Sequence, residues 1–180
     1  AKTLTIGEST GKSAAYTGDI SGTSGRTTGG TGILTRRGDN KYTGATKIGT
    51  GSTLTLGTNG TIEGSSGVSI AGMVRRASET AIDSMTGAGA TTLGANTLTI
   101  GDVTGTSSAY TGDISGTGGL TTAGTGILTL SGVNQYTGAT TIGTGSTLTL
   151  DTNGTIEGSS GVSNAGMLTI ASSKTIDSMT

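Results

Sequence analysis

The stretch GTGILTLSGVNQYTGATTIGTGSTLTL at residues 124–150 decides the fold. It contains two short runs in which Leu alternates with Thr, at 127–130 and 147–150, separated by a polar segment rich in Gly. Alternate residues of a β-strand point to opposite faces of a sheet, so each run places Leu on one face and Thr on the other. The pattern predicts two short strands, each buried on one face only. An earlier stretch, residues 30–56, repeats this pattern with a few changes.

The chain as a whole is a tandem duplication of a long unit. Ala1 aligns with Ala95, an offset of 94 residues, and residues 1–86 then differ from residues 95–180 at only 21 positions. One structural interpretation must therefore serve both copies. We take residues 1–94 as a first unit, which is rich in Arg and irregular, and residues 95–180 as a second unit, which is regular and truncated. Together they are expected to form one continuous solenoid.

A shorter period lies inside each unit. In the second copy the alternating runs contain Leu98, Leu128, Leu148 and Leu168, which are 30, 20 and 20 residues apart. Repeats of this length are typical of solenoids, in which each coil stacks on the one before. We therefore predict an all-β fold, a right-handed parallel β-helix (β-solenoid) of about 7–8 coils. Leu should stack on Leu inside the coils, and Thr on Thr outside.

The composition agrees with a thin core that is repeated along an axis. The chain has 36 Gly, is 30% hydrophobic, and contains no Pro, Cys, His, Trp or Phe. So much Gly and Thr is also found in disordered chains, but the regular alternation and the absence of Pro favour a fold. The net charge of −1 predicts no general attraction to nucleic acid. No apolar run is long enough to insert into a membrane, and residues 1–10 do not have the form of a signal peptide.

The quoted stretch resembles the autotransporter-associated β-strand repeat. The matching residues in the second copy are Gly126, Leu128, Leu130, Gly132, Asn134, Tyr136, Thr137, Gly138, Thr140, Ile142 and Gly145. Those in the first copy are Gly32, Leu34, Gly38, Asn40, Tyr42, Thr43, Gly44, Thr46, Ile48 and Gly51. The resemblance implies a β-helical passenger region of a secreted bacterial surface protein, which serves as a scaffold and neither catalyses a reaction nor holds a cofactor.

From this resemblance and the repeat we expect a rod or fibre at a bacterial cell surface, with an adhesin-like role. Neither end of the chain has the sequence of a cap, and an uncapped solenoid exposes strand edges that invite further pairing. The expected partners are the continuation of the same array, or copies associated end to end, and also a host surface or a glycan. The absence of Cys suits a protein that is exported across an envelope.

Three arginines of the first copy depart from the pattern. Arg26, Arg36 and Arg76 stand where the second copy has Leu120, Leu130 and Ile170. The alternation places all three inside the coils, where an unpaired guanidinium costs several kcal/mol. Three accounts remain open: the first copy is distorted or locally open, the arginines reach out to solvent at coil corners, or the sequence has been altered there. The first copy carries a net charge of about +3 and the second about −4.

Two surface motifs are candidate sites. The threonines Thr99, Thr129, Thr149 and Thr169 are expected to form an outward ladder, and regular Thr arrays on solenoids occur in ice-binding proteins. A binding module, for ice or for glycans, is therefore the alternative function. Thr is also common on any exposed sheet face, which is the simpler interpretation. Arg37, Gly38 and Asp39 spell RGD, a tripeptide that integrin-type receptors recognise on protruding loops, although a chance match is easy in this chain.

Catalytic and metal sites have weak support in the sequence. The acids recur as Glu8 and Asp102, Asp19 and Asp113, Glu63 and Glu157, and Asp83 and Asp177, which are one unit apart. One unit corresponds to roughly 19 Å along the axis, whereas a glycosidase pair needs about 5–10 Å. A carbohydrate-active enzyme is therefore the less favoured hypothesis. The absence of His and Cys argues against zinc, and no calcium nonapeptide pattern is present.

Overall fold

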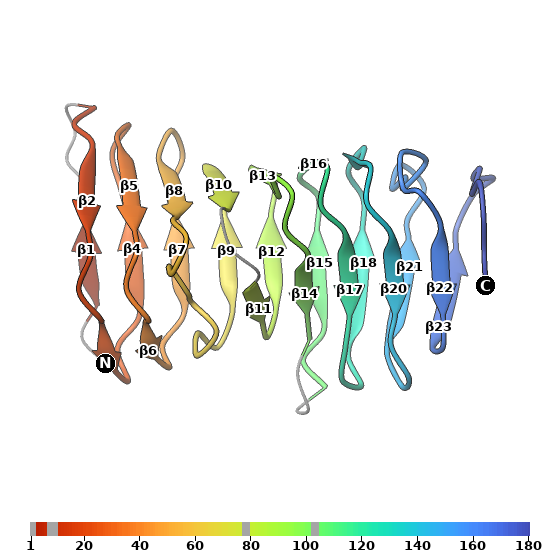
Figure 1. Cartoon of the computed structure of the whole chain (residues 1–180), viewed down its shortest axis with the longest axis horizontal. Coiled ribbons are helices and arrows are strands. Elements are labelled where there is room, and N and C mark those ends of the chain that lie inside the picture. Colours follow the sequence, from red (N-terminus) through yellow and green to blue (C-terminus); the bar gives the residue numbers. More distant parts are fainter. Residues whose placement is uncertain (1–2, 7–10, 77–79, 102–104) are drawn as a thin grey trace.

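The chain forms a β-solenoid of about eight turns in which the paired strands run parallel (Figure 1). The computed structural model describes residues 3–6, 11–76, 80–101 and 105–180. Figure 1 shows the strands side by side in chain order from one terminus to the other, and this row forms the long axis of the molecule. The predicted all-β parallel solenoid is confirmed. The part of the chain that the structure describes contains no helix that could span a membrane.

Sheet A runs the length of the solenoid and contains strands from both copies. Its nine strands, in spatial order, are β1 (Leu4–Ile6), β4 (Arg26–Thr28), β7 (Thr46–Ile48), β9 (Val68–Ile70), β12 (Met85–Gly87), β15 (Ser108–Tyr110), β18 (Ile127–Leu130), β21 (Thr147–Leu150) and β23 (Met167–Ile170). Since this order is also the chain order, every coil adds its strand directly onto the one before.

Two further positions in each coil complete the turn. Sheet B holds β2 (Ala14–Tyr16), β5 (Ile33–Arg36), β8 (Thr53–Leu56), β10 (Met73–Arg76), β13 (Ala90–Thr92), β16 (Ile114–Gly116) and β19 (Gln135–Tyr136). The third position holds sheet C, with β3 (Ser21–Gly22) and β6 (Lys41–Tyr42), and then sheet D, with β11 (Thr80–Ile82), β14 (Leu98–Ile100), β17 (Leu120–Thr122), β20 (Thr140–Ile142) and β22 (Val162–Asn164). The chain therefore visits three faces in turn.

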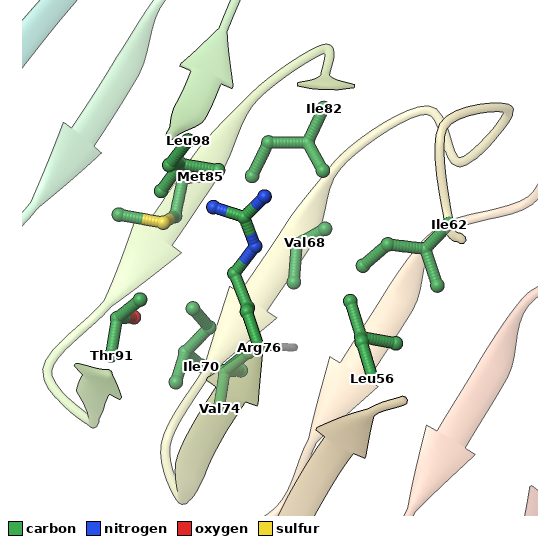
Figure 2. A pocket seen from close by; sticks show the side chains of 10 residues that line it. All are labelled: Leu56, Ile62, Val68, Ile70, Val74, Arg76, Ile82, Met85, Thr91 and Leu98. Carbon is green, nitrogen blue, oxygen red and sulfur yellow. The ribbon is translucent and has the colours of Figure 1, made fainter. Parts of the chain in front are cut away.

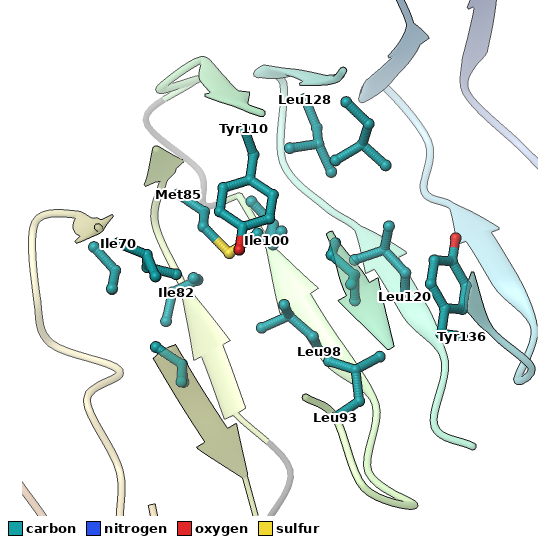
Figure 3. Packing of buried hydrophobic residues seen from close by; sticks show 14 of the residues in the cluster. Ile70, Ile82, Met85, Leu93, Leu98, Ile100, Tyr110, Leu120, Leu128 and Tyr136 are labelled. Carbon is teal, nitrogen blue, oxygen red and sulfur yellow. The ribbon is translucent and has the colours of Figure 1, made fainter. Parts of the chain in front are cut away.

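The core is a set of columns inside the coils. In sheet B, for example, Leu34, Leu54 and Val74 occupy one register position on successive strands, and all three are buried. Figure 3 shows the same packing near the middle of the rod, where Met85, Ile100 and Tyr110 fill the interior. Burying an aliphatic side chain of this size contributes roughly 1.5–3 kcal/mol. A thin interior can therefore hold the coils together because it is repeated in every coil.

The repeat in the sequence is out of phase with the turns of the solenoid. Leu4 of the first copy lies in sheet A and pairs with Arg26, whereas its equivalent Leu98 lies in sheet D and pairs with Leu120. In the same way β5 lies in sheet B, and its equivalent β18 lies in sheet A. Ninety-four residues therefore do not contain a whole number of turns, and equivalent segments of the two copies lie on different faces.

This phase shift corrects the predicted stack of leucines. Leu128, Leu148 and Leu168 do stack in register, at steps of 20 residues, in sheet A. Leu98 belongs to sheet D, so the step of 30 residues from Leu98 to Leu128 is not one coil. The sequence interpretation assumed that all the alternating Leu/Thr runs stack in one column. Any short alternating run can, however, occupy any of the three faces, since each face has one side in the core and one in solvent.

Candidate functional site

The residues that carry the family resemblance form a buried polar corner. In the second copy the Asn134 Oδ1 accepts a hydrogen bond from the Ile114 N–H of the preceding coil (3.0 Å), and its Nδ2 donates to Gly132 O and Thr155 O. The Tyr136 and Thr140 hydroxyls are hydrogen-bonded at 2.6 Å, and Thr140 continues to Ser159 at 2.9 Å. Burial raises the pKa of the Tyr136 phenol well above its ordinary value. This corner ties adjacent coils together and is therefore structural.

The first copy builds the same corner around a buried cation. The Tyr42, Thr46 and Ser65 hydroxyls repeat the chain of hydrogen bonds at 2.6 and 2.9 Å. Arg36, whose side chain is only 2% exposed, donates to Asn40 Oδ1 (2.6 Å) and to the Tyr42 hydroxyl (3.3 Å). Burial lowers the pKa of the Arg36 guanidinium, and the nearby Arg26 charge lowers it further. The asparagine oxygen that accepts a backbone N–H in one copy therefore accepts a guanidinium in the other.

Arg26 shares the same tyrosine from the neighbouring face of the coil. Its guanidinium carbon lies 4.9 Å from the centre of the Tyr42 ring, and that of Arg36 lies at 5.2 Å. Arg26 also donates to the backbone carbonyls of Ser21, Ser24 and Gly25. Among the residues that the structure describes, no carboxylate lies within ion-pair distance of Arg26 or Arg36. The two cations are held by carbonyl dipoles and by the electron-rich face of one ring.

Arg76 lines an apolar cavity near the junction of the two copies (Figure 2). The cavity measures about 20 Å³, and its other walls are Leu56, Ile62, Val68, Ile70, Val74, Ile82, Met85, Thr91 and Leu98. The Arg76 guanidinium donates to Thr97 O at 3.1 Å. A space of this size holds about one water molecule, and its lining offers almost no polar partners. The cavity is a packing feature, because it has no room for a substrate.

The inward placement of the three arginines is confirmed. Arg26 and Arg76 are 8% and 6% exposed, so neither they nor Arg36 extend into solvent, although Arg26 does reach the carbonyls of a coil corner. The coils are not opened either, because β4, β5 and β10 each pair with a strand on both sides. Two of the accounts proposed from the sequence, a locally open coil and arginines that reach solvent, are therefore wrong for these described residues.

The threonine ladder is present in part. Thr129, Thr149 and Thr169 stand in register on β18, β21 and β23, with their side chains outside sheet A. Thr99 is not in this ladder, since it lies in sheet D between Ala81 and Thr121. The next outward column of sheet A holds Ile127, Thr147 and Met167, with Ile127 and Met167 exposed. Three threonines beside a mixed column do not make the regular two-column array expected of an ice-binding face.

The RGD tripeptide lies in a coil corner directly after β5. A Cβ at Gly38 would lie 2.1 Å from the carbonyl oxygen of Gly18, so only glycine allows the two coils to stack here. The Asp39 carboxylate accepts a hydrogen bond from Thr61 Oγ1 (3.1 Å) and pairs with Lys41 Nζ (3.1 Å). The lysine, followed by the threonine, lowers the pKa of Asp39. The geometry favours a structural role for Gly38 and Asp39, because Gly38 packs against the neighbouring coil and the Asp39 carboxylate is engaged by Thr61 and Lys41.

One pair of acids lies closer than the sequence interpretation allowed. Asp19 and Asp39 are on neighbouring coils, and the Asp39 N–H donates to Asp19 Oδ1 at 2.7 Å. The expectation that carboxylates recur only one unit apart is wrong here, because Asp39 replaces the Val133 of the second copy. Asp113 makes the equivalent bond to the Val133 N–H. Glu8 and Asp102 lie outside the described residues. Within the described part of the chain, no group of three His, Cys, Asp or Glu residues is arranged to hold a metal ion.

The sequence interpretation missed a groove on the outside of sheet B. It measures about 540 Å³ and is lined by Thr35, Arg37, Thr55, Gly57, Thr58 and Asn59. The signal was available, because two of the 21 differences between the copies belong together here. Arg37 and Gly57 of the first copy correspond to Ser131 and Asp151 of the second.

A search of known protein families, of curated proteins and of solved structures gives no match to the chain.

Proposed function

We propose that the chain is a structural solenoid segment that builds a rod or fibre at a bacterial cell surface, with a passenger-like or adhesin-like role. It would do so as part of a longer array or by end-to-end association. The observation that carries the proposal is the unbroken parallel ladder, whose terminal strands leave core side chains uncovered. The resemblance of residues 30–56 and 124–150 to the autotransporter-associated repeat supports the surface location.

The exposed fractions of equivalent side chains in the two copies show how far the ends of the solenoid are uncovered. Leu98 is 2% exposed inside the rod, but its equivalent Leu4, on the first strand of sheet A, is 44% exposed. Met85 is 1% exposed, and its equivalent Met179 near the other end is 60% exposed. The same side chains are buried wherever another coil covers them. A coil of the same kind, from the array or from a second copy, is therefore the natural cover for each end.

Charge favours a head-to-tail arrangement. The first copy carries about +3 and the second about −4, so stacking the start of one molecule on the end of another brings opposite charges together. Stacking two like ends would bring like charges together. The free backbone groups of β1 and β23 would then pair in parallel, as every other strand does.

The test is association measured as a function of concentration. Light scattering and electron microscopy of the 180-residue chain should show linear oligomers that dissociate as salt is raised. The double variant Leu4→Lys/Ile170→Lys places charges on both end strands and should remain monomeric. Ile127→Lys, an exposed apolar residue on a lateral face, is the matched control and should associate normally. A chain that stays monomeric at high concentration and low salt would sink the proposal.

A further inference from the structure

The groove outside sheet B presents polar side chains that no described residue of the protein satisfies. It runs across β5 and β8 and the turn that follows β8. In the described part of the chain, the side chains of Arg37, Thr55, Thr58 and Asn59 make no hydrogen bond and no ion pair. Its volume of about 540 Å³ lies within the range of ordinary ligand sites, roughly 300–1,000 Å³. The surface is therefore open and also rich in unused donors.

Arg37 packs on a glycine of the next coil at the edge of the groove. A Cβ at Gly57 would lie 2.7 Å from Arg37 Cγ, so the aliphatic part of the arginine lies directly on the Gly57 backbone. This contact holds the side chain against the sheet, where Arg37 lines the groove together with Thr35, Thr55 and Thr58. A guanidinium positioned in this way can donate two parallel hydrogen bonds to a carboxylate or sulfate.

A second arginine stands beside the same site. Arg75 of β10 is in register with Thr55 of β8, on the outer side of sheet B. Its Nε donates to the Met73 sulfur at 3.3 Å, and its other guanidinium nitrogens make no hydrogen bond within the described residues. Thr55 therefore lies between the strand that leads to Arg37 and the strand that carries Arg75. Two positive charges on one face of hydroxyl-bearing residues favour a ligand that is both anionic and rich in hydroxyl groups.

The second copy has the same backbone features without this chemistry. Ser131 and Asp151 replace Arg37 and Gly57, and Thr169 replaces Arg75. Asp151 accepts hydrogen bonds from Ser131 Oγ (3.0 Å) and from the Thr152 N–H (2.7 Å). Lys174 and Ser172 donate to Thr152 O, both at 2.9 Å. The equivalent surface is satisfied by its own residues and has neither arginine.

We propose that the groove formed by Arg37, Thr55, Thr58 and Asn59, with Arg75 at its edge, binds an acidic sugar chain. The guanidinium of Arg37 takes the anionic group, and the Thr and Asn side chains bind the neighbouring hydroxyls. The shared chemistry is an oxyanion on a sugar ring, either a carboxylate or a sulfate. The chain's overall charge of −1 disfavours a long polyanion such as nucleic acid.

The experiment uses the repeat as its own control. Calorimetric titration with trigalacturonate should give one site on the intact chain, while the neutral galactose trimer should not bind. The variant Arg37→Ser/Gly57→Asp, which copies the second unit, should weaken the affinity about tenfold or more, as expected for loss of a charge-assisted pair. A sulfated galactose oligosaccharide, titrated in parallel, distinguishes carboxylate from sulfate as the preferred group.

The reverse change tests whether these positions are sufficient. Ser131→Arg/Asp151→Gly/Thr169→Arg should raise the stoichiometry from one site to two. Circular dichroism and the melting temperature of each variant separate lost binding from lost folding. Equal affinity for the neutral trimer, absence of binding by either anionic sugar, or unchanged affinity in Arg37→Ser/Gly57→Asp would each overturn the proposal. The variant Leu4→Lys/Ile170→Lys should bind trigalacturonate with the affinity of the unsubstituted chain. This result would separate sugar binding from end-to-end association.

Discussion

Two columns of side chains at the inward register position, one from each copy, show what the fold requires and what it tolerates. In sheet B the first copy places Tyr16, Arg36, Leu56 and Arg76 at one register position on successive strands. In sheet A the second copy places Tyr110, Leu130, Leu150 and Ile170 at the equivalent position. The strand ladders are alike in both. Register is therefore set by backbone pairing, by glycine at the stacked corners and by the Asn and Tyr corners, more than by a uniformly apolar interior.

The difference between the two columns lies in their electrostatics. Each buried guanidinium in the first copy has lost its hydration, and Arg26 and Arg36 have no carboxylate partner among the described residues. Neutral partners such as Asn40 and Tyr42 recover only part of that loss. The first copy should therefore be the less stable half of the rod, and this expectation can be tested directly.

The largest effect on stability is expected when the buried arginines of the first copy are replaced by the apolar residues of the second copy. Arg26→Leu/Arg36→Leu/Arg76→Ile should raise the free energy of unfolding by roughly 3–6 kcal/mol, because apolar residues often stabilise a protein when they replace buried ionic groups. Urea unfolding measures the change. Lys47→Thr also copies the second unit but lies outside sheet A, so it should change stability by less than about 0.5 kcal/mol. No gain in the triple variant would contradict the comparison.

The reverse substitution should change the free energy of unfolding by nearly as much. Leu130→Arg puts a guanidinium beside Asn134 and Tyr136, where Asn134 Oδ1 already accepts the Ile114 N–H. We expect a loss of about 3–5 kcal/mol from the lost apolar contacts and the buried charge. Thermal and urea unfolding measure it, with Leu130→Met as the conservative control at under about 1.5 kcal/mol. If Leu130→Arg were neutral, the interior would discriminate between Leu and Arg much less than we infer.

Removing the hydroxyl of the corner tyrosine should cost a different amount of stability in each copy, and this difference should be smaller than the effects above. Tyr136→Phe removes the hydrogen bond to Thr140 and should cost about 1–2 kcal/mol. Tyr42→Phe also removes the acceptor for Arg36, so its cost should be larger by about 1 kcal/mol. Chemical denaturation of both variants gives the difference. Repeating it in the Arg36→Leu background should make the two tyrosines equivalent, and a persistent gap would refute the role of Arg36.

The smallest effect concerns acid stability at the surface of the second copy. The Thr152 N–H, followed by Ser131, lowers the pKa of Asp151. A carboxylate whose pKa is lowered in the folded state stabilises the fold above its unfolded pKa of about 4, and this contribution disappears as the pH falls through the folded value. Asp151→Asn should therefore melt slightly below the unsubstituted chain at pH 6 and level with it near pH 2. Melting curves across that range test the sign.

The sequence predicted the architecture well and the register less well. Alternation of Leu with Thr specified strands with one buried face, and it correctly placed Arg26, Arg36 and Arg76 inside. It did not reveal that Leu98 and Leu128 belong to different sheets, because all three faces of the coil accept the same pattern. The same ambiguity explains why Thr99 was wrongly predicted to belong to the threonine ladder of sheet A. Only the pairing of strands resolves it.

The candidate site was less accessible to sequence reasoning. The proximity of Asp19 to Asp39, and of Arg37 to Gly57, depends on a step of 20 residues between neighbouring coils. The leucine runs show this step in the sequence, but they do not show which corners of neighbouring coils stack on one another. Comparing substitutions that occur together between the copies would have marked Arg37 and Gly57, but their shared groove requires the stacked backbone.

The mismatch between unit and turn determines how a longer protein of this kind would look from outside. Each added unit of 94 residues would move any given side chain to the next of the three faces, so that the fourth unit would repeat the orientation of the first. A group such as Arg37 would then follow a spiral around the fibre and would not form a single stripe. Such a fibre would present the same chemistry in every direction, and it could engage surroundings that approach from any side.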